Sequence, residues 1–159
     1  MLMLLFYIGK DCYAIESDRV VEVIPGIPLR KIHHVPDYVP GLFNYRGQIA
    51  PVIDLCHLIQ GKPSGKKLST RIIMVSSSTN DNTLQYLGLM AERVIKTLDK
   101  PETELINSDA RMNVAPYLGG MILDQNGMIQ RIHLDQLFAD ARHLYLAAGA
   151  PNTDEPSKN

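Results

Sequence analysis

Cys56 and His57 stand next to each other in the sequence, and a thiol beside an imidazole is a pairing used by cysteine nucleophiles. The run Gln48 to Leu55 before them predicts a strand, and neighbours on a strand point to opposite faces, so these two side chains cannot chelate one metal. The only other cysteine is Cys12, so no zinc knuckle is predicted. A small β-barrel enzyme using Cys56 or His57 with a distant partner stays open as the alternative function.

Other segments that could carry catalytic chemistry lack the residues it needs. The loop "GKPSGKK" (61 to 67) has three residues instead of four between Gly61 and Gly65, and Lys67 stands where a phosphate-binding loop needs Ser or Thr. The carboxylates are scattered, so no acid and base pair converges. The sequence predicts a protein that is not an enzyme and needs no cofactor or metal.

The composition is that of an ordinary globular domain, with 159 residues, 45% hydrophobic residues and a formal net charge of -1. Such a balanced charge does not indicate nucleic-acid binding or an anionic membrane surface. The apolar start "MLMLLFYI" is too short to span a bilayer, which takes ~20 residues, and it lacks the basic start of a signal peptide. We predict a buried strand, a cytoplasmic location and no direct membrane insertion.

Short apolar runs bounded by Gly, Pro, Asn and Asp predict a mostly β structure. One segment, 135 to 148, has the apolar spacing of a helix, with Asp135 as its expected N-cap. His133 is expected to pack at the end of the strand before it. The tail from 149 to 159 has no apolar anchor and is expected to be disordered. The expected strands cover residues 4–8, 12–16, 20–24, 41–45, 48–55, 71–76, 84–90, 94–98, 118–123 and 128–134.

The chain also resembles itself at low identity. Residues 13–24 match 87–98, each with a strand, an acidic residue, Arg and Val, and then a second strand. Residues 51–58 match 130–137 in the same way. Internal similarity of this length predicts two similar units packed together. Because short strands need closure to hide their edges, we expect two small antiparallel barrels.

The stretch "NYRGQIAPVIDL" (44 to 55) places Arg46 and Gly47 at the tip of a predicted hairpin. Gly47 permits a positive φ, so the turn can be tight and can hold Arg46 in a fixed pose. A guanidinium offers five donors and a flat face, which suits carboxylates, amides and helix-end carbonyls of a partner. The hairpin is therefore a candidate binding element.

Together, "GLFNYRGQIAPVIDL" (41 to 55), "RVVEVI" (19 to 24) and "YLGGMILDQNGMIQRIHLDQLF" (117 to 138) resemble the CheW family of chemotaxis coupling proteins. The resemblance runs from about Leu4 to Leu146. It implies an all-β fold with a C-terminal helix, made of two pseudo-repeated five-stranded SH3-like β-barrels. It also implies one CheW-like domain of two barrel lobes over residues 1–148.

The resemblance implies a non-enzymatic adaptor that couples the cytoplasmic helical hairpin of a methyl-accepting chemoreceptor to the regulatory domain of a CheA-type histidine kinase. Such an adaptor is cytoplasmic and associated with membrane-bound receptor arrays. Its receptor-binding positions fall on Gly41 and Arg46, with Gly47 in the same turn, and its kinase or lobe-interface positions on Val20 and Glu22. Tyr45 departs from the family, which usually has Leu there. A main motility pathway and an auxiliary surface-sensing or pilus pathway both stay open.

Overall fold

The computed structural model describes residues 1–65, 67–99, 105–106, 115–125 and 127–147. The chain begins with an antiparallel hairpin of β1 (Leu2–Ile8) and β2 (Asp11–Glu16), in which Ile8 pairs with Asp11. Gly9 adopts a φ of 61° in the two-residue turn, a conformation that glycine takes without a steric cost. This hairpin joins the two strands expected at residues 4–8 and 12–16, and the apolar N-terminal run is a strand with buried residues on both faces.

The strand after each of two hairpins leaves its own sheet. A short 3-10 helix, η1 (Ser17–Arg19), follows β2 and leads into β3 (Val20–Pro25), which pairs with β6 (Arg71–Ser78). In turn, β6 forms a hairpin with β7 (Leu84–Ala91), and the next strand, β8 (Arg93–Asp99), crosses back to pair with β1. Each sheet therefore contains one strand from the other half of the chain.

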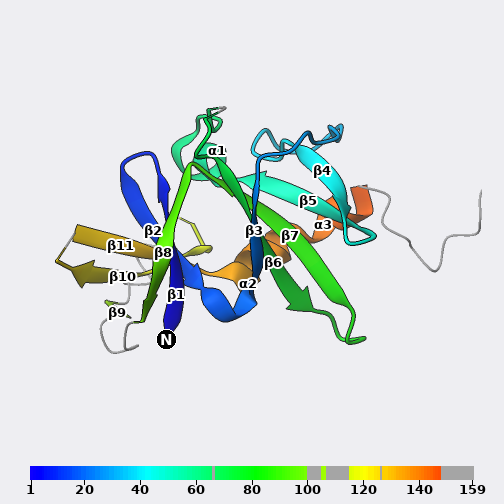
Figure 1. Ribbon diagram of the computed structural model, residues 1–159. Coiled ribbons are helices and arrows are strands. Elements are labelled where there is room, and N and C mark those ends of the chain that lie inside the picture. The colour runs from blue at the N-terminus through cyan, green and yellow to red at the C-terminus, as the bar shows by residue number, and fades with distance from the viewer. Residues whose placement is uncertain (66, 100–104, 107–114, 126, 148–159) are drawn as a thin grey trace, which may run out of the picture.

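Two further hairpins complete the sheets. One joins β4 (Gly41–Tyr45) to β5 (Gln48–Asp54), and the other joins β10 (Leu118–Asp124) to β11 (Gly127–Ile132). They attach through parallel pairs, β5 to β7 and β11 to β2. Sheet A has the order β8-β1-β2-β11-β10-β9, and sheet B has the order β3-β6-β7-β5-β4 (Figure 1).

This topology confirms the internal repeat. Strands β1 to β5 take the same places in their sheets as β6, β7, β8, β10 and β11, including the crossing strand and the parallel pair. Sheet A has six strands where five were expected, because the two-residue strand β9 (Leu105–Ile106) adds to its edge beside β10. The architecture is the predicted mostly β fold with two similar halves.

A helix that was not predicted follows β5. The strand expected to reach Leu55 ends at Asp54, and α1 (Leu55–Gln60) begins there. The Asp54 carboxylate accepts hydrogen bonds from the backbone N–H groups of Cys56 and His57, and Gly61 ends the helix at a φ of 76°. The placement of Cys56 and His57 on a strand was therefore wrong, because an N-capping aspartate and a C-terminal glycine together define a short helix.

The predicted C-terminal helix is present but divided. It consists of α2 (Leu134–Asp140) and α3 (Arg142–Ala147), with Ala141 between them. Asp135 lies in the first turn instead of capping it, and His133 takes the cap position without a side-chain bond. The apolar residues whose spacing predicted this helix are buried: Leu137, Phe138, Ala141, Leu144 and Tyr145. The expected disorder of 149–159 concerns residues outside the described part of the chain and stays a prediction.

Three apolar clusters form the core. The central cluster lies between the two sheets and receives Phe6 and Ile15 from sheet A, Ile73 and Leu87 from sheet B, and Phe138 from α2. Figure 1 shows α2 running between the two sheets. Each sheet also encloses a smaller cluster of its own. Strands such as β1 have buried residues on both faces, which explains their nearly continuous apolar sequences.

Candidate binding surface

The β4–β5 hairpin ends in a two-residue turn made by Arg46 and Gly47, between the paired residues Tyr45 and Gln48. Arg46 has a φ of 52° and Gly47 a φ of 83°, as in the type I′ turns that suit the twist of β-hairpins. The side chain of Asn44 accepts a hydrogen bond of 2.9 Å from the Gly47 N–H. The positive φ predicted for Gly47 is confirmed, and Arg46 shares it, so the turn has a defined and rigid geometry.

Arg46 is half-exposed at the tip of this turn. Its guanidinium carbon lies 5.2 Å from the centre of the Tyr45 ring, a cation–π arrangement. One terminal nitrogen lies 3.7 Å from Oε1 of Glu22 on β3, and both side chains are about half exposed (55% and 43%). A long, solvent-screened ion pair of this kind contributes little to stability. The guanidinium is therefore oriented and still accessible.

Tyr45 and Glu22 join the two edges of sheet B. Strands β3 and β4 are at opposite ends of that sheet, yet the Tyr45 hydroxyl donates a hydrogen bond of 2.5 Å to Oε1 of Glu22. Burial, reinforced by this hydrogen bond, raises the pKa of Tyr45 to about 12, so the hydroxyl remains a donor at neutral pH. This side-chain contact joins the two edge strands, β3 and β4, so that sheet B curves toward a closed barrel.

Gly41, at the start of β4, is required by a close backbone approach. Arg30 forms a two-way backbone bridge with Leu42, and the Arg30 carbonyl oxygen would lie 2.4 Å from a Cβ placed on Gly41. Gly41 is buried beneath this bridge. It supports the segment that links β3 to β4, which is a structural reason for glycine here.

Val20 and Glu22 do not share one environment. Val20 is half-buried and packs against the central cluster, whereas Glu22 is exposed beside the Arg46 turn. A register irregularity between them in the β3–β6 pairing interrupts the alternation that would place both on one face. The structure therefore groups Glu22 with Arg46 and separates it from Val20.

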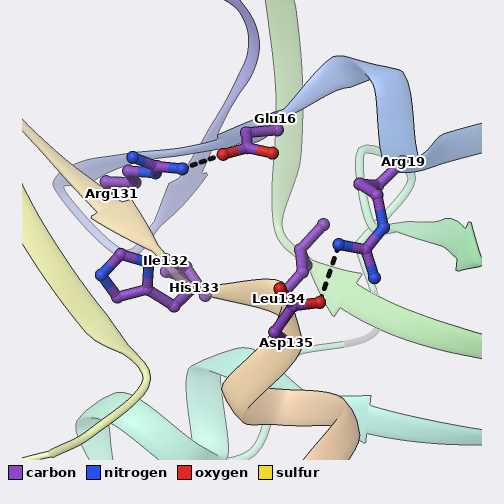
Figure 2. Close-up of a pocket in the computed structure, with 7 residues that line it drawn as sticks. All are labelled: Glu16, Arg19, Arg131, Ile132, His133, Leu134 and Asp135. Atoms are coloured by element: carbon purple, nitrogen blue, oxygen red, sulfur yellow. Dashed lines mark hydrogen bonds and ion pairs between the residues drawn. The ribbon is translucent and has the colours of Figure 1, made fainter. Parts of the chain in front are cut away.

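A second polar group, at the junction of the two sheets, was not predicted. Arg19 in η1 forms an ion pair of 2.8 Å with Asp135 on α2 (Figure 2). Arg19 donates a hydrogen bond of 3.0 Å to the Ser76 carbonyl on β6. It also stacks over the ring of Phe138. Its counterpart in the repeat, Arg93, stacks over Tyr7. The repeated Arg-Val pair was the sequence signal: Arg19 directly precedes the crossing strand β3, and Arg93 is the first residue of the crossing strand β8.

Arg131 on β11 and Glu16 at the end of β2 form the other ion pair of this junction. Nε of Arg131 is buried and has no hydrogen-bond partner in the described part of the chain. His133 lies after the end of β11 and is exposed, with its ring against Gly119, so it is less buried than expected. Partial desolvation, and then the charge of Arg131, lowers the pKa of His133. A cavity of about 50 Å³ separates the two ion pairs, with room for about one or two waters.

Cys56 has the environment of a structural thiol. It is buried, and its sulfur donates to the Glu92 carboxylate over 3.3 Å. Burial and this interaction raise the pKa of the thiol to about 11, whereas a nucleophilic cysteine needs a lowered pKa. Among the described residues, no group of three or more His, Cys, Asp or Glu side chains could hold a metal ion. The enzyme alternative based on Cys56 or His57 is not supported.

The fold is two interlocked β halves, and an exposed arginine stands at the tip of one of their hairpins. The chain belongs to the family described as the CheW-like domain, whose model matches residues 2–142. This family is one of scaffolding and adaptor proteins rather than enzymes. Within the described part of the chain, no helix is both long and apolar enough to cross a bilayer.

Relatives and a solved structure agree with this assignment. A probable chemotaxis protein CheW from Rhizobium etli is 26% identical over 143 residues, which cover 87% of each chain. The chemotaxis protein CheW of Helicobacter pylori is 29% identical over 100 residues, or 63% of this chain and 58% of that relative. The crystal structure of the scaffolding protein TtCheW from Thermoanaerobacter tengcongensis matches with a TM-score of 0.73 and 26% identity, over 86% of both chains.

Proposed function

We propose that this protein is a chemosensory adaptor that couples the cytoplasmic helical hairpin of a chemoreceptor to the regulatory domain of a CheA-type histidine kinase. The observation that carries the proposal is the Arg46 turn: a guanidinium held at a fixed position and left half-exposed. A rigid site loses little conformational freedom on binding, which favours affinity.

The receptor contact is assigned to the surface around Arg46 and Gly47. The five donors of Arg46 suit the carboxylates, amides and terminal carbonyls of a helical partner. Gly41 contributes indirectly in this scheme, because its close contact with Arg30 supports β4 from below.

The kinase contact is assigned to β3, with Val20 and Glu22. Glu22 is exposed and lies within reach of Arg46, so the two proposed contacts adjoin each other. Because Val20 packs on the central cluster, we expect it to act on the kinase contact by shaping β3 as well as by touching the partner.

The test is a titration of variants against a purified receptor cytoplasmic fragment and, separately, a kinase regulatory domain. Arg46→Glu is expected to weaken receptor binding by about 2–4 kcal/mol, as for a charge-reversed interface hot spot, and to leave the fold and kinase binding in place. Arg93→Glu is the matched control, since Arg93 also stacks on a tyrosine ring, on sheet A. Equal receptor affinity of both variants and the wild type would remove Arg46 from the receptor interface.

The proposed place of action is the cytoplasm, next to membrane-bound receptor arrays. The pathway is a motility system or a surface-sensing system, and the cognate receptor distinguishes them. Recovery of a histidine kinase and a chemoreceptor from native lysate with the tagged protein would support the adaptor role, and recovery of neither would contradict it.

A further inference from the structure

Tyr45 lies at the base of the Arg46 turn, paired with Gln48 across the hairpin. It is 6% exposed, and its ring packs edge-to-face against Phe43 and Tyr86 with centroids 5.9 and 5.1 Å away. The ring therefore cannot turn freely, and its hydroxyl has one fixed direction, toward Glu22.

One carboxylate oxygen of Glu22 faces both the Tyr45 hydroxyl and the Arg46 guanidinium. Oε1 of Glu22 accepts the Tyr45 hydroxyl over 2.5 Å and lies 3.7 Å from the terminal nitrogen of Arg46. A charge-assisted O–H···O⁻ bond is typically 2.5–2.7 Å long, and an Arg–carboxylate hydrogen bond 2.7–2.9 Å. The tyrosine therefore holds this oxygen at full hydrogen-bond strength, and the arginine does not.

We infer that Tyr45 is a positioning residue that sets how available Arg46 is to its partner. Its hydroxyl fixes the Glu22 carboxylate at a distance from the guanidinium, and its ring face supports the guanidinium from below. Because the Glu22 oxygen stays 3.7 Å away, the donors of Arg46 are available to a carboxylate or carbonyl acceptor on a helical partner. This inference rests on the proposed function and extends it to a residue that the family resemblance leaves unexplained.

Tyr45→Phe is the direct test, because it keeps the packed ring and removes only the hydroxyl. Released from the tyrosine, Glu22 is expected to close on Arg46 and compete with the partner. We expect affinity for the receptor cytoplasmic fragment to fall about two- to fivefold, the scale of a partly exposed ion pair. Glu22→Gln in the same chain removes the competitor, so the double variant is expected to regain the wild-type affinity.

The double variant separates positioning from packing. If Tyr45 only packed the core, any loss in Tyr45→Phe would persist with Gln at position 22, and that result would overturn the inference. Tyr7→Phe, which alters the tyrosine beneath Arg93 on sheet A, is the matched control. Should Tyr45→Phe not fold, Glu22→Gln alone decides. Receptor affinity within about twofold of the wild type supports the inference, because Tyr45 already keeps Glu22 away from Arg46, and a larger change in either direction contradicts it.

Arg46→Glu, measured in the same titration, distinguishes the proposed receptor contact of Arg46 from the inferred positioning role of Tyr45. Lost binding in Arg46→Glu with unchanged binding in Tyr45→Phe would refute only the role of Tyr45. Unchanged binding in Arg46→Glu would refute the receptor contact and, with it, the inference that depends on that contact.

Discussion

Asp54 is a buried carboxylate, 4% exposed, that organises its surroundings through hydrogen bonds. It accepts from the N–H groups of Cys56 and His57 at the start of α1, and from both the N–H and the hydroxyl of Ser64 at 2.7 and 2.6 Å. Through Ser64, the loop "GKPSGKK" (61 to 67) is thus held by hydrogen bonds to the end of β5. A residue expected inside a strand that runs to Leu55 ends that strand and fixes both a helix and a loop.

Asp54→Ala is expected to lower the free energy of unfolding by about 2–4 kcal/mol, because it removes a helix cap and leaves several donors without an acceptor. In a chain of this size that corresponds to a fall in melting temperature of roughly 5–15 °C. Asp140→Ala is the control, since Asp140 is exposed and accepts one hydrogen bond from Gln136. Equal melting temperatures for the two variants would show that the Asp54 contacts are dispensable.

At the scale of elements, the long connection from β3 to β4 is held where Arg30 bridges Leu42. Gly41 allows this approach because it has no Cβ. The bridge holds the connection against the start of β4. At the other end of β4, Tyr45 donates a hydrogen bond to Glu22 on β3. The Arg46 turn is thus supported through β4 as well as through β5.

Gly41→Ala is expected to destabilise the fold by about 1–3 kcal/mol or more, because the new Cβ would meet a backbone carbonyl at 2.4 Å and the chain must shift. Gly26→Ala is the control in the same connection, with no atom within 4 Å of the added Cβ. Thermal melts followed by circular dichroism give the comparison. A Gly41→Ala protein as stable as the wild type but unable to bind the receptor fragment would indicate that Gly41 contacts the partner directly.

At the scale of the whole molecule, the exchange of β3 and β8 links the two sheets. Sheet B takes β3 from the first half of the chain, and sheet A takes β8 after the β6–β7 hairpin. The central cluster then packs both sheets against α2. Each sheet is incomplete without a strand from the other half of the chain. On this basis we propose that residues 1–148 form a single folding unit.

The prediction is one cooperative unfolding transition. Leu5→Ala in the sheet A cluster and Met74→Ala in the sheet B cluster are each expected to cost about 2–5 kcal/mol. Hydrogen exchange read separately in β1 and β7 should show both sheets weakened by either substitution. If each substitution loosened only its own sheet, the halves would be independent domains and the single-unit proposal would be wrong.

The positions of the strands followed from the sequence, because short-range physics fixes them. Apolar runs between turn formers located nearly every strand, and Arg46-Gly47 marked a tight turn whose positive φ the structure confirms. The internal repeat predicted two similar halves, and the topology has them. The short helix α1 was missed because its capping residue, Asp54, also continues an apolar strand pattern.

Only the tertiary structure decided which strands pair beyond the local hairpins and which charges meet. Nothing local in "RVVEVI" says that β3 pairs with β6 instead of β2, because strand pairing depends on distant partners. The contacts of Glu22 with Tyr45 and Arg46 cross a closed sheet, and Arg19 meets Asp135 over 116 positions of the chain. The sequence determined most of the elements and the arginine turn. The packing of those elements placed Tyr45 and Glu22 beside that arginine, because the strands that carry them meet only in the folded sheet.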